Sequence, residues 1–275
     1  MFISAILRIE VYRMLGTGIL MKYLFGQACF FTLLVAFSIT AGAQGDNITD
    51  SPFTVTVGVD HSPPYRIVNA QTQSGLYLDI FNEIAERLDW QVVYKEVPFR
   101  RILMLMREGE VDIMLGPVKV ESRQDFMTYV APAFPPEKRL FFYLDEENRI
   151  DRYSDLYGKA VGVLEGATYF ERFDQDEKLN KQTAPRYRNL MMMLEKGRVD
   201  VVVAPEFAGL AAARNLVPQA EVSPFSVPGK SSWIAVSNKS QVMSCADELI
   251  EVLEQVEREG LMESLVQEYM GQTVN

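Results

Sequence analysis

Few side chains in this 275-residue protein could do covalent chemistry. His61 is the one histidine, and Cys245 lies on a helical pattern typical of a buried apolar residue. These two residues supply neither a Ser-His-Asp triad nor a Cys-His pair, and a lone histidine does not make a metal site. Acid chemistry remains, because Asp60, Glu165 or Glu206 could act as a general acid if burial raised its pKa. We therefore predict a protein without metal or cofactor, and not an enzyme.

One stretch of sequence occurs twice. Residues 107–117 are REGEVDIMLGP, and residues 195–205 are EKGRVDVVVAP. In each copy we expect the glycine to end a helix in the left-handed conformation, Val-Asp to open a buried strand and the proline to end it. Ligands of α/β sheets bind beyond the carboxyl ends of the strands, so two such units could face one cleft. A chance likeness within a single domain is the alternative.

The elements around these units alternate between strand and helix. Alternating apolar residues predict a strand at 53–59, and apolar residues four apart predict a helix from Leu76 to about Asp89. Further strands are expected at 91–97, 111–115, 160–164, 199–203 and 233–236, and further helices at 99–108, 169–173, 189–196, 241–258 and 261–270. This alternation predicts an α/β fold with mainly parallel sheets.

The composition is that of a globular, acidic protein. Hydrophobic residues make up 48% and charged residues 23%, and 27 basic against 37 acidic side chains give a net charge of −10. No net basic field is available to neutralise phosphates, so we expect no nucleic-acid partner.

Residues 1–43 are predicted to be a cleaved signal peptide whose true start is Met21. Lys22 supplies a positive charge, residues 24–39 are apolar and uncharged, and Ala41-Gly42-Ala43 offers a cleavage site before Gln44. The apolar run is shorter than the ~20 residues of a membrane span. An uncleaved N-terminal anchor is the alternative.

From Phe53 to Gly271 the motifs resemble those of the bacterial family 3 extracellular solute-binding proteins, the amino-acid receptors of ABC importers. The matching segments are 57–60, 63–65, 75–80, 109–112, Arg123 with Tyr129, 155–163, 166–168, 197–200, Gly260 and 269–271. The resemblance implies a two-lobed periplasmic-binding-protein-like α/β fold, with a mainly parallel sheet and flanking helices in each lobe. Lobe 1 would comprise 51–138 plus 228–275, and lobe 2 would comprise 142–224. Two crossover strands, near 139–143 and 224–230, would join them.

The same resemblance implies ligand-binding roles for single residues. Arg123 matches the arginine that grips a ligand carboxylate with its planar guanidinium. Thr168 matches a position at the start of the first helix of lobe 2, where hydroxyl and backbone N–H groups meet an anion. It could equally cap its own helix, since 168–171 has the form of a capping box. Phe99 matches an aromatic wall, or else packs in the core, and Asp60 and Tyr65 lie on the loop after the first strand, facing the expected cleft.

The chain departs from the family pattern at two places. The segment that begins at Gly116, expected to line the site, is poor in the hydroxyl groups that the family uses there. The family's carboxylate for the ligand's amino group falls on Pro205, and the adjacent Glu206 would need a shifted backbone to replace it. The carboxylate clamp is therefore retained while ammonium recognition is in doubt. Three cations expected near the mouth favour an anionic or non-standard ligand, namely Arg66, Arg100 and Lys119.

The sequence thus predicts a monomeric periplasmic receptor. It would capture a small, polar, carboxylate-bearing solute by hinge closure and deliver it to an ABC permease. Two alternatives stay open, an exported sensor or orphan binding module and an enzyme of the cyclohexadienyl-dehydratase kind on the same fold.

Overall fold

The computed structural model describes residues 53–69 and 71–274. From Pro52 onward the chain forms one compact unit. The predicted signal peptide, with its start at Met21 and its cleavage site, lies outside the described residues. Among the residues that are described, no helix is long and apolar enough to cross a membrane.

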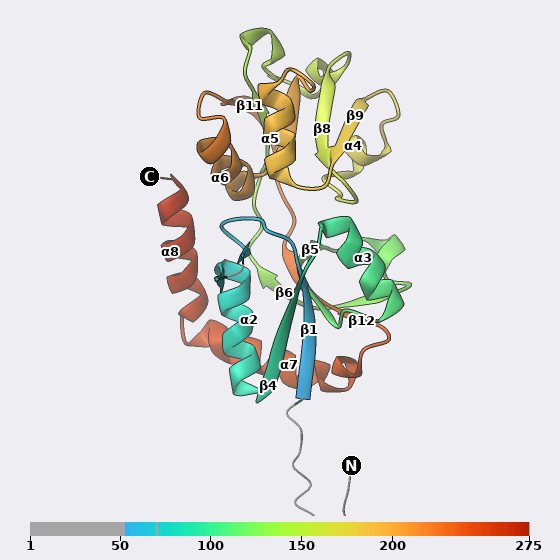
Figure 1. The fold of residues 1–275 in the computed structure, drawn as a ribbon, viewed down its shortest axis with the longest axis vertical. Helices are drawn as coiled ribbons and strands as arrows, with labels where there is room; N and C mark the ends of the chain where they lie inside the picture. Colours follow the sequence, from blue (N-terminus) through green and yellow to red (C-terminus); the bar gives the residue numbers. More distant parts are fainter. Residues whose placement is uncertain (1–52, 70, 275) are drawn as a thin grey trace, which may run out of the picture. The chain divides into compact units, whose positions relative to one another are not determined.

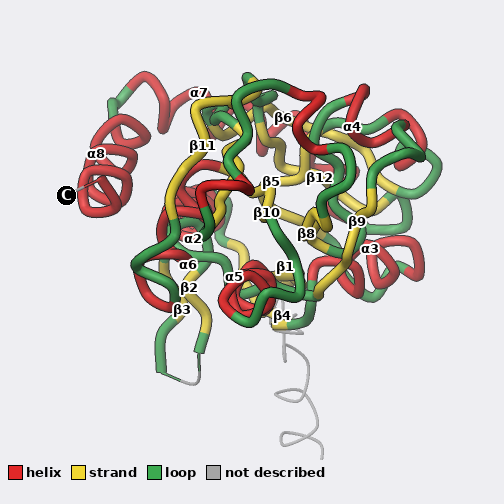
Figure 2. Tube along the Cα trace, turned by 90° about the horizontal axis from the view of Figure 1, so that it is seen from above, coloured by secondary structure: helices red, strands yellow, loops and turns green. Residues whose placement is uncertain are grey.

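The first sheet draws its strands from both ends of the described chain (Figure 1). Its order is β4-β1-β5-β12-β6, and the strands are β1 (Phe53–Val59), β4 (Trp90–Glu96), β5 (Ile113–Val118), β6 (Met127–Phe134) and β12 (Ser232–Ser237). The helices of this half are α2 (Leu76–Arg87), α3 (Phe99–Glu108), α7 (Ala246–Arg258) and α8 (Leu261–Val274). A hairpin of β2 (Ile67–Val68) and β3 (Gln73–Ser74) precedes α2 and projects away from the sheets in Figure 2.

The second sheet is built entirely from the middle of the chain. Its order is β11-β7-β10-β8-β9, and the strands are β7 (Arg139–Tyr143), β8 (Ala160–Leu164), β9 (Asn180–Ala184), β10 (Val201–Pro205) and β11 (Glu221–Val227). Its helices are α4 (Glu171–Gln175), α5 (Tyr187–Glu195) and α6 (Glu206–Leu216). The apolar residues 140–142 of β7 are buried between neighbouring elements, as expected for an inner strand.

Both sheets are mixed, and in each of them one strand runs against the direction of the other four. In the first sheet β4, β1 and β5 run parallel while β12 pairs antiparallel with β5 and β6. In the second, β10, β8 and β9 run parallel while β7 pairs antiparallel with β10 and β11. The antiparallel partners are the strands next to the links between the sheets, where the chain enters and leaves each half.

The two repeated segments occupy equivalent places in the two sheets. Asp112 precedes β5, and its carboxylate accepts a hydrogen bond from the backbone N–H of Thr56 in β1, at 2.8 Å. Asp200 precedes β10, and its carboxylate accepts one from the backbone N–H of Ala160 in β8, at 2.7 Å. Each aspartate therefore ties the start of its strand to the neighbouring parallel strand, and the sequence likeness reflects a shared structural role.

Residues 135–138 and 228–231 link the two sheets. The predicted crossover ranges border these links: 139–143 is β7, which follows the first link, and 224–230 covers the end of β11 and most of the second link. The links touch at Gly229, where an added Cβ would lie 1.6 Å from the backbone oxygen of Glu137. Only glycine fits this approach. The two sheets fall on either side of these links, and the exact lobe boundaries stay a prediction.

Candidate functional site

A small cavity of about 60 Å³ lies where β5 and β10 end. Both repeated segments reach it, through Pro117 at one side and Pro205 at the other. The remaining lining residues come from α3, from the turn after β5, from the start of β7, from the loop after β8 and from the start of α5. They are Phe99, Gly116, Val118, Arg123, Arg139, Ala167, Thr168, Tyr169 and Tyr187.

Arg123 reaches this cavity from a single 3-10 turn, Glu121–Arg123. Its side chain is buried, and its Nη2 donates a 2.9 Å hydrogen bond to the backbone oxygen of Gly166, in the second half of the protein. The guanidinium carbon lies 5.9 Å from the centre of the Phe99 ring. Burial lowers the pKa of Arg123, yet a guanidinium remains charged at any physiological pH. The cavity therefore contains a fixed, desolvated positive charge.

Thr168 lies across the cavity, on the loop after β8. The alternative that it caps a helix is wrong, because α4 begins at Glu171 with Phe170 as its N-cap and no side-chain cap. This helix has only five residues, so the sequence-based argument from a helix N-terminus also fails. Of the anion-binding groups expected here, the Thr168 hydroxyl itself remains.

Two polar atoms of this cavity have no hydrogen-bond partner. Among the described residues, Arg123 Nη1 and Thr168 Oγ1 are the buried side-chain nitrogen and oxygen atoms left without one. Buried polar atoms in proteins are almost always paired, so each exception needs an explanation. The two residues line one cavity and belong to different halves of the protein.

Arg139 also lines the cavity, although the sequence predicts it only as part of a crossover strand. It is the first residue of β7 and is 5% exposed. Its Nη1 donates to the backbone oxygen of Glu137, at 3.2 Å, and no carboxylate of the described chain lies within 4 Å of its guanidinium. Its place just before the apolar run 140–142 is the available signal in the sequence, but register is needed to place it.

Two tyrosines add hydroxyl groups to the wall. Burial raises the pKa of Tyr169 to about 12, and its oxygen accepts the backbone N–H of Leu164 at 2.8 Å. Burial raises the pKa of Tyr187 well above its ordinary value. Both phenols are therefore neutral at physiological pH, and their hydroxyls are hydrogen-bonded to each other. Neither is predicted from the sequence, because tyrosines are common in apolar cores.

Three predicted ligand contacts are not among the residues that line the cavity. Asp60 is buried in an ion pair with Arg66, at 2.9 Å, and Arg66 also donates to the backbone oxygen of Leu115. The Tyr65 hydroxyl donates to the carboxylate of Glu137. Glu206 begins α6 immediately after the lining residue Pro205. Of the predicted residues, Arg123, Thr168, Phe99 and Gly116 are the ones that the fold brings together.

Gly116 shapes the cavity through its backbone. Its φ is +91°, a region that residues with a side chain rarely adopt, and an added Cβ would lie 2.3 Å from the Tyr77 ring. Arg66 Nη1 would be 2.9 Å away. The last part of β5 therefore depends on this glycine, which stands where the expected pattern has hydroxyl-bearing residues.

The other expected cations have partners of their own. Arg100 forms an ion pair with Glu165, which joins α3 to the loop after β8. Lys119 Nζ lies 5.0 Å from the Trp233 ring. With Arg66 held by Asp60, the positive charge at the cavity wall comes from Arg123 and Arg139.

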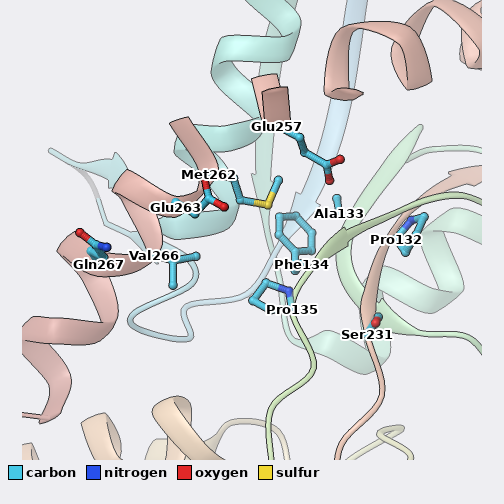
Figure 3. Close-up of a pocket in the computed structure, with 10 residues that line it drawn as sticks. All are labelled: Pro132, Ala133, Phe134, Pro135, Ser231, Glu257, Met262, Glu263, Val266 and Gln267. Carbon is cyan, nitrogen blue, oxygen red and sulfur yellow. The ribbon is translucent and has the colours of Figure 1, made fainter. Parts of the chain in front are cut away.

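A larger groove of about 660 Å³ lies elsewhere, between β6 and the last two helices (Figure 3). Phe134 and Met262 point into it, and Glu257 and Glu263 are its charged lining residues. Its charge is negative and its other lining is mostly apolar, so it does not suit a carboxylate-bearing solute. Among the described residues, no group of three or more His, Cys, Asp or Glu side chains is placed to bind a metal.

Comparison with known proteins identifies the family. The model of the bacterial extracellular solute-binding proteins, family 3, matches residues 55–272. The chain belongs to this family. Family 3 proteins are extracellular binding proteins, which agrees with the receptor class predicted from the sequence.

Two curated relatives are similar at low identity. One is a "Probable histidine-binding protein" of Campylobacter jejuni, 22% identical over 56% of this chain and 61% of its own length. The chain thus spans about three fifths of that relative. The other is a "Putative amino-acid ABC transporter-binding protein PatH" of Vibrio harveyi, 21% identical over 76% of this chain and 84% of its own length.

Solved structures share the fold. A Salmonella typhimurium periplasmic binding protein, described for its high arginine specificity, matches with a TM-score of 0.70 and 18% identity over 79% of this chain and 99% of its own. A histidine kinase sensor domain similar to periplasmic binding proteins matches with a TM-score of 0.67 and 18% identity over 81% of this chain and 98% of its own. The predicted two-lobed α/β fold class is therefore confirmed.

Proposed function

We propose that this protein is a periplasmic receptor that binds a small carboxylate-bearing solute in the cavity between its two sheets and delivers it to an ABC importer. The observation that carries the proposal is the pair of unpartnered buried atoms, Arg123 Nη1 and Thr168 Oγ1. A carboxylate offers one oxygen to each and would satisfy both.

The chemistry favours an anion for this place. A guanidinium binds carboxylates through parallel N–H donors, and a hydroxyl can donate to the same group. Arg123 already uses Nη2 on Gly166, so Nη1 is the donor left for a ligand. Because the site is desolvated, each such bond is stronger than it would be in water.

Closure of the two halves is part of the proposal. Arg123 contacts Gly166, and Arg100 contacts Glu165, so the described arrangement has the halves in contact at the cavity. The links 135–138 and 228–231 are the segments about which they would part to admit a solute. We expect small-angle scattering to show a smaller radius of gyration with ligand than without it. An unchanged radius on saturation with a bound ligand would contradict the closure step.

The binding site is tested by removing the guanidinium. Arg123→Ala should weaken binding of a carboxylate ligand by roughly 30-fold or more, because truncating one partner of a buried charged pair costs about 2–5 kcal/mol. Arg123→Lys should recover only part of the affinity, since an ammonium cannot reproduce the two-pronged geometry. Titration calorimetry against a panel of amino acids and dicarboxylates measures both.

Arg258→Ala is the matched control. Its side chain is 65% exposed and pairs with Glu254, one helical turn away in α7. It should bind like the parent. Equal affinity in Arg123→Ala and Arg258→Ala would remove Arg123 from the site.

A second candidate is an exported sensor module that signals through a partner protein. The structural likeness to a histidine kinase sensor domain favours it, because that fold also serves signalling. Uptake of a labelled ligand by cells with and without this protein separates the two. A dependence of uptake on the protein supports the receptor, and ligand binding without any effect on uptake supports the sensor.

The dehydratase alternative lacks its acid. Asp60, Glu165 and Glu206 are the carboxylates it would use, and none of them is among the residues that line the cavity. Asp60 is paired with Arg66 and Glu165 with Arg100. We therefore propose reversible binding rather than catalysis.

A further inference from the structure

The charge that faces the cavity is of one sign. Arg123 and Arg139 both line it and both are at most 7% exposed, while no aspartate or glutamate is among its lining residues. The other polar groups in the wall are the hydroxyls of Thr168, Tyr169 and Tyr187. All of these side chains can donate a hydrogen bond, and the guanidiniums can do nothing else.

Two carboxylates that act on the cavity arginines are committed to protein donors. Glu137 accepts from the Tyr65 hydroxyl and, at 3.3 Å, from the backbone N–H of Phe207. Asp174 accepts the backbone N–H of Tyr169 through both oxygens, at 3.1 Å. These two acids act on Arg139 and Arg123 only from outside the lining. Neither of them is among the residues that line the cavity.

Arg139 lies at the start of β7, where the second sheet borders the cavity. It stands directly opposite Pro205 in the antiparallel register of β7 with β10. Pro205 has no N–H and no polar side chain, so this edge of the cavity presents a cation and no acceptor side chain. Arg139 also belongs to the second half of the protein, while Arg123 lies after a strand of the first.

A ligand with an ammonium group fits this wall poorly. The ammonium would enter a desolvated space with two fixed positive charges and no lining carboxylate, and like charges that close repel strongly in a low dielectric. A second acidic group on the ligand would instead meet a guanidinium. A ligand with two negative charges places one opposite each guanidinium of the wall.

We infer that the natural ligand is a small dicarboxylate without an amino group, with one carboxylate bound by Arg123 and Thr168 and the other by Arg139. The inference rests on the proposed function and narrows its ligand class. The small volume of the cavity restricts the ligand to a short carbon chain. Arg139 is then a specificity-determining residue that faces the end of the ligand where an amino acid would differ.

The test uses pairs of probes that differ only in the amino group. Titration calorimetry of the exported protein compares succinate with L-aspartate and glutarate with L-glutamate, with L-arginine and butyrate alongside. At least one dicarboxylate should bind ~30-fold or more tightly than its amino-acid counterpart, the ratio expected for an unpaired buried charge. L-arginine should not bind measurably.

Substitution of Arg139 separates its role from that of Arg123. Arg139→Gln should lower the affinity for the preferred dicarboxylate ~30-fold or more while changing that for butyrate less than about threefold. Arg123→Ala should lower the affinity for the dicarboxylate and the affinity for butyrate. Arg139→Lys keeps the charge and should retain a preference for dicarboxylates, which guards against a simple loss of folding. If Arg139→Gln does not fold, the probe pairs on the parent protein decide.

The outcomes distinguish this inference from the proposed function. An amino acid that binds as tightly as its matched dicarboxylate overturns the dicarboxylate inference and leaves the receptor proposal standing. Equal losses for butyrate and dicarboxylate in Arg139→Gln also overturn it, because Arg139 would then hold no second carboxylate. If no probe of either class raises the melting temperature at millimolar concentration, both proposals fail.

Discussion

The two repeated segments, 109–117 and 197–205, share a scaffold and differ in the chain beyond their prolines. In both, the glycine has a left-handed backbone, with φ of +81° at Gly109 and +61° at Gly197, and the aspartate ties its strand to a parallel neighbour. After the first segment the chain runs on to the turn that holds Arg123. After the second it enters α6 at once. The framework is repeated, and the residues that line the cavity lie at its ends or just beyond it.

This difference explains why the two halves share residues of the framework but not the residues that line the cavity. Asp112 and Asp200 accept hydrogen bonds from backbone N–H groups, so any sequence that keeps these contacts keeps the sheets. Arg123 and Arg139 each donate to a backbone oxygen, of Gly166 and of Glu137. On the proposed function their charge serves the ligand, and the two halves are then free to differ there.

The largest effect on stability is expected at the paired aspartates. Asp112 accepts from Thr56 N–H and, through its other oxygen, from the Ser240 hydroxyl at 2.6 Å, whereas the Asp200 side chain accepts from Ala160 N–H. Asp112→Ala should lower the free energy of unfolding by about 3 kcal/mol and Asp200→Ala by about 2 kcal/mol. Urea denaturation measures both. A larger loss of unfolding free energy in Asp200→Ala than in Asp112→Ala would contradict this ranking of the two aspartates.

A smaller effect is expected at the paired glycines. Gly109→Ala and Gly197→Ala should each cost ~1 kcal/mol, because alanine is strained in the left-handed region. The loss at Gly109 should be the greater, since its added Cβ would lie 3.0 Å from Lys239, while nothing lies within 4 Å at Gly197. Thermal melting compares them. Stabilisation by either alanine would show that the left-handed conformation is not required.

The smallest effect is a pH dependence outside both segments, in the link between the sheets. Burial raises the pKa of Glu137, so this carboxyl binds its proton more tightly in the folded than in the unfolded protein. Its contribution to the free energy of unfolding is therefore present at pH below the ordinary glutamate pKa and is lost as pH rises through the raised one. The hydrogen bond from Tyr65 and the charge of Arg139 lower the pKa of Glu137, and the charge of Glu206 raises it.

In Glu137→Gln the free energy of unfolding should no longer fall as pH rises through this range. Denaturation curves collected across the acidic range, for the parent and the variant, test this. A parent whose stability rises over the same range while the variant stays flat would give Glu137 the opposite sign.

Much of the framework can be predicted because local pattern determines it. The strand 53–59 and the helix 99–108 match β1 and α3 to the residue, as apolar periodicity and the flanking Pro98 and Gly109 set their ends. Helix α6 is not predicted, because its alanine-rich sequence has little amphipathic contrast. The helix expected at 169–173 lies at Glu171–Gln175, because Thr168 does not act as its cap.

The site can be predicted only in part. Arg123 and Thr168 are found by resemblance, and the fold places both at one cavity. Asp60 is expected in the cleft but is buried against Arg66, a contact that depends on the loop between β1 and β2 and that no local pattern specifies. Arg139 escapes prediction because its contact with the cavity depends on the β7–β10 register, a pairing of residues far apart in sequence.

The central claim is that Arg123 and Thr168, from the two halves, hold one carboxylate of one ligand. A double-mutant cycle with Arg123→Ala and Thr168→Val tests it most directly, by titration calorimetry with the tightest-binding probe. We predict losses of roughly 30-fold and roughly tenfold for the single variants, and a combined loss clearly below the product of the two, because the residues share one group. Unchanged affinity in either single variant, or losses that multiply fully, would contradict the account.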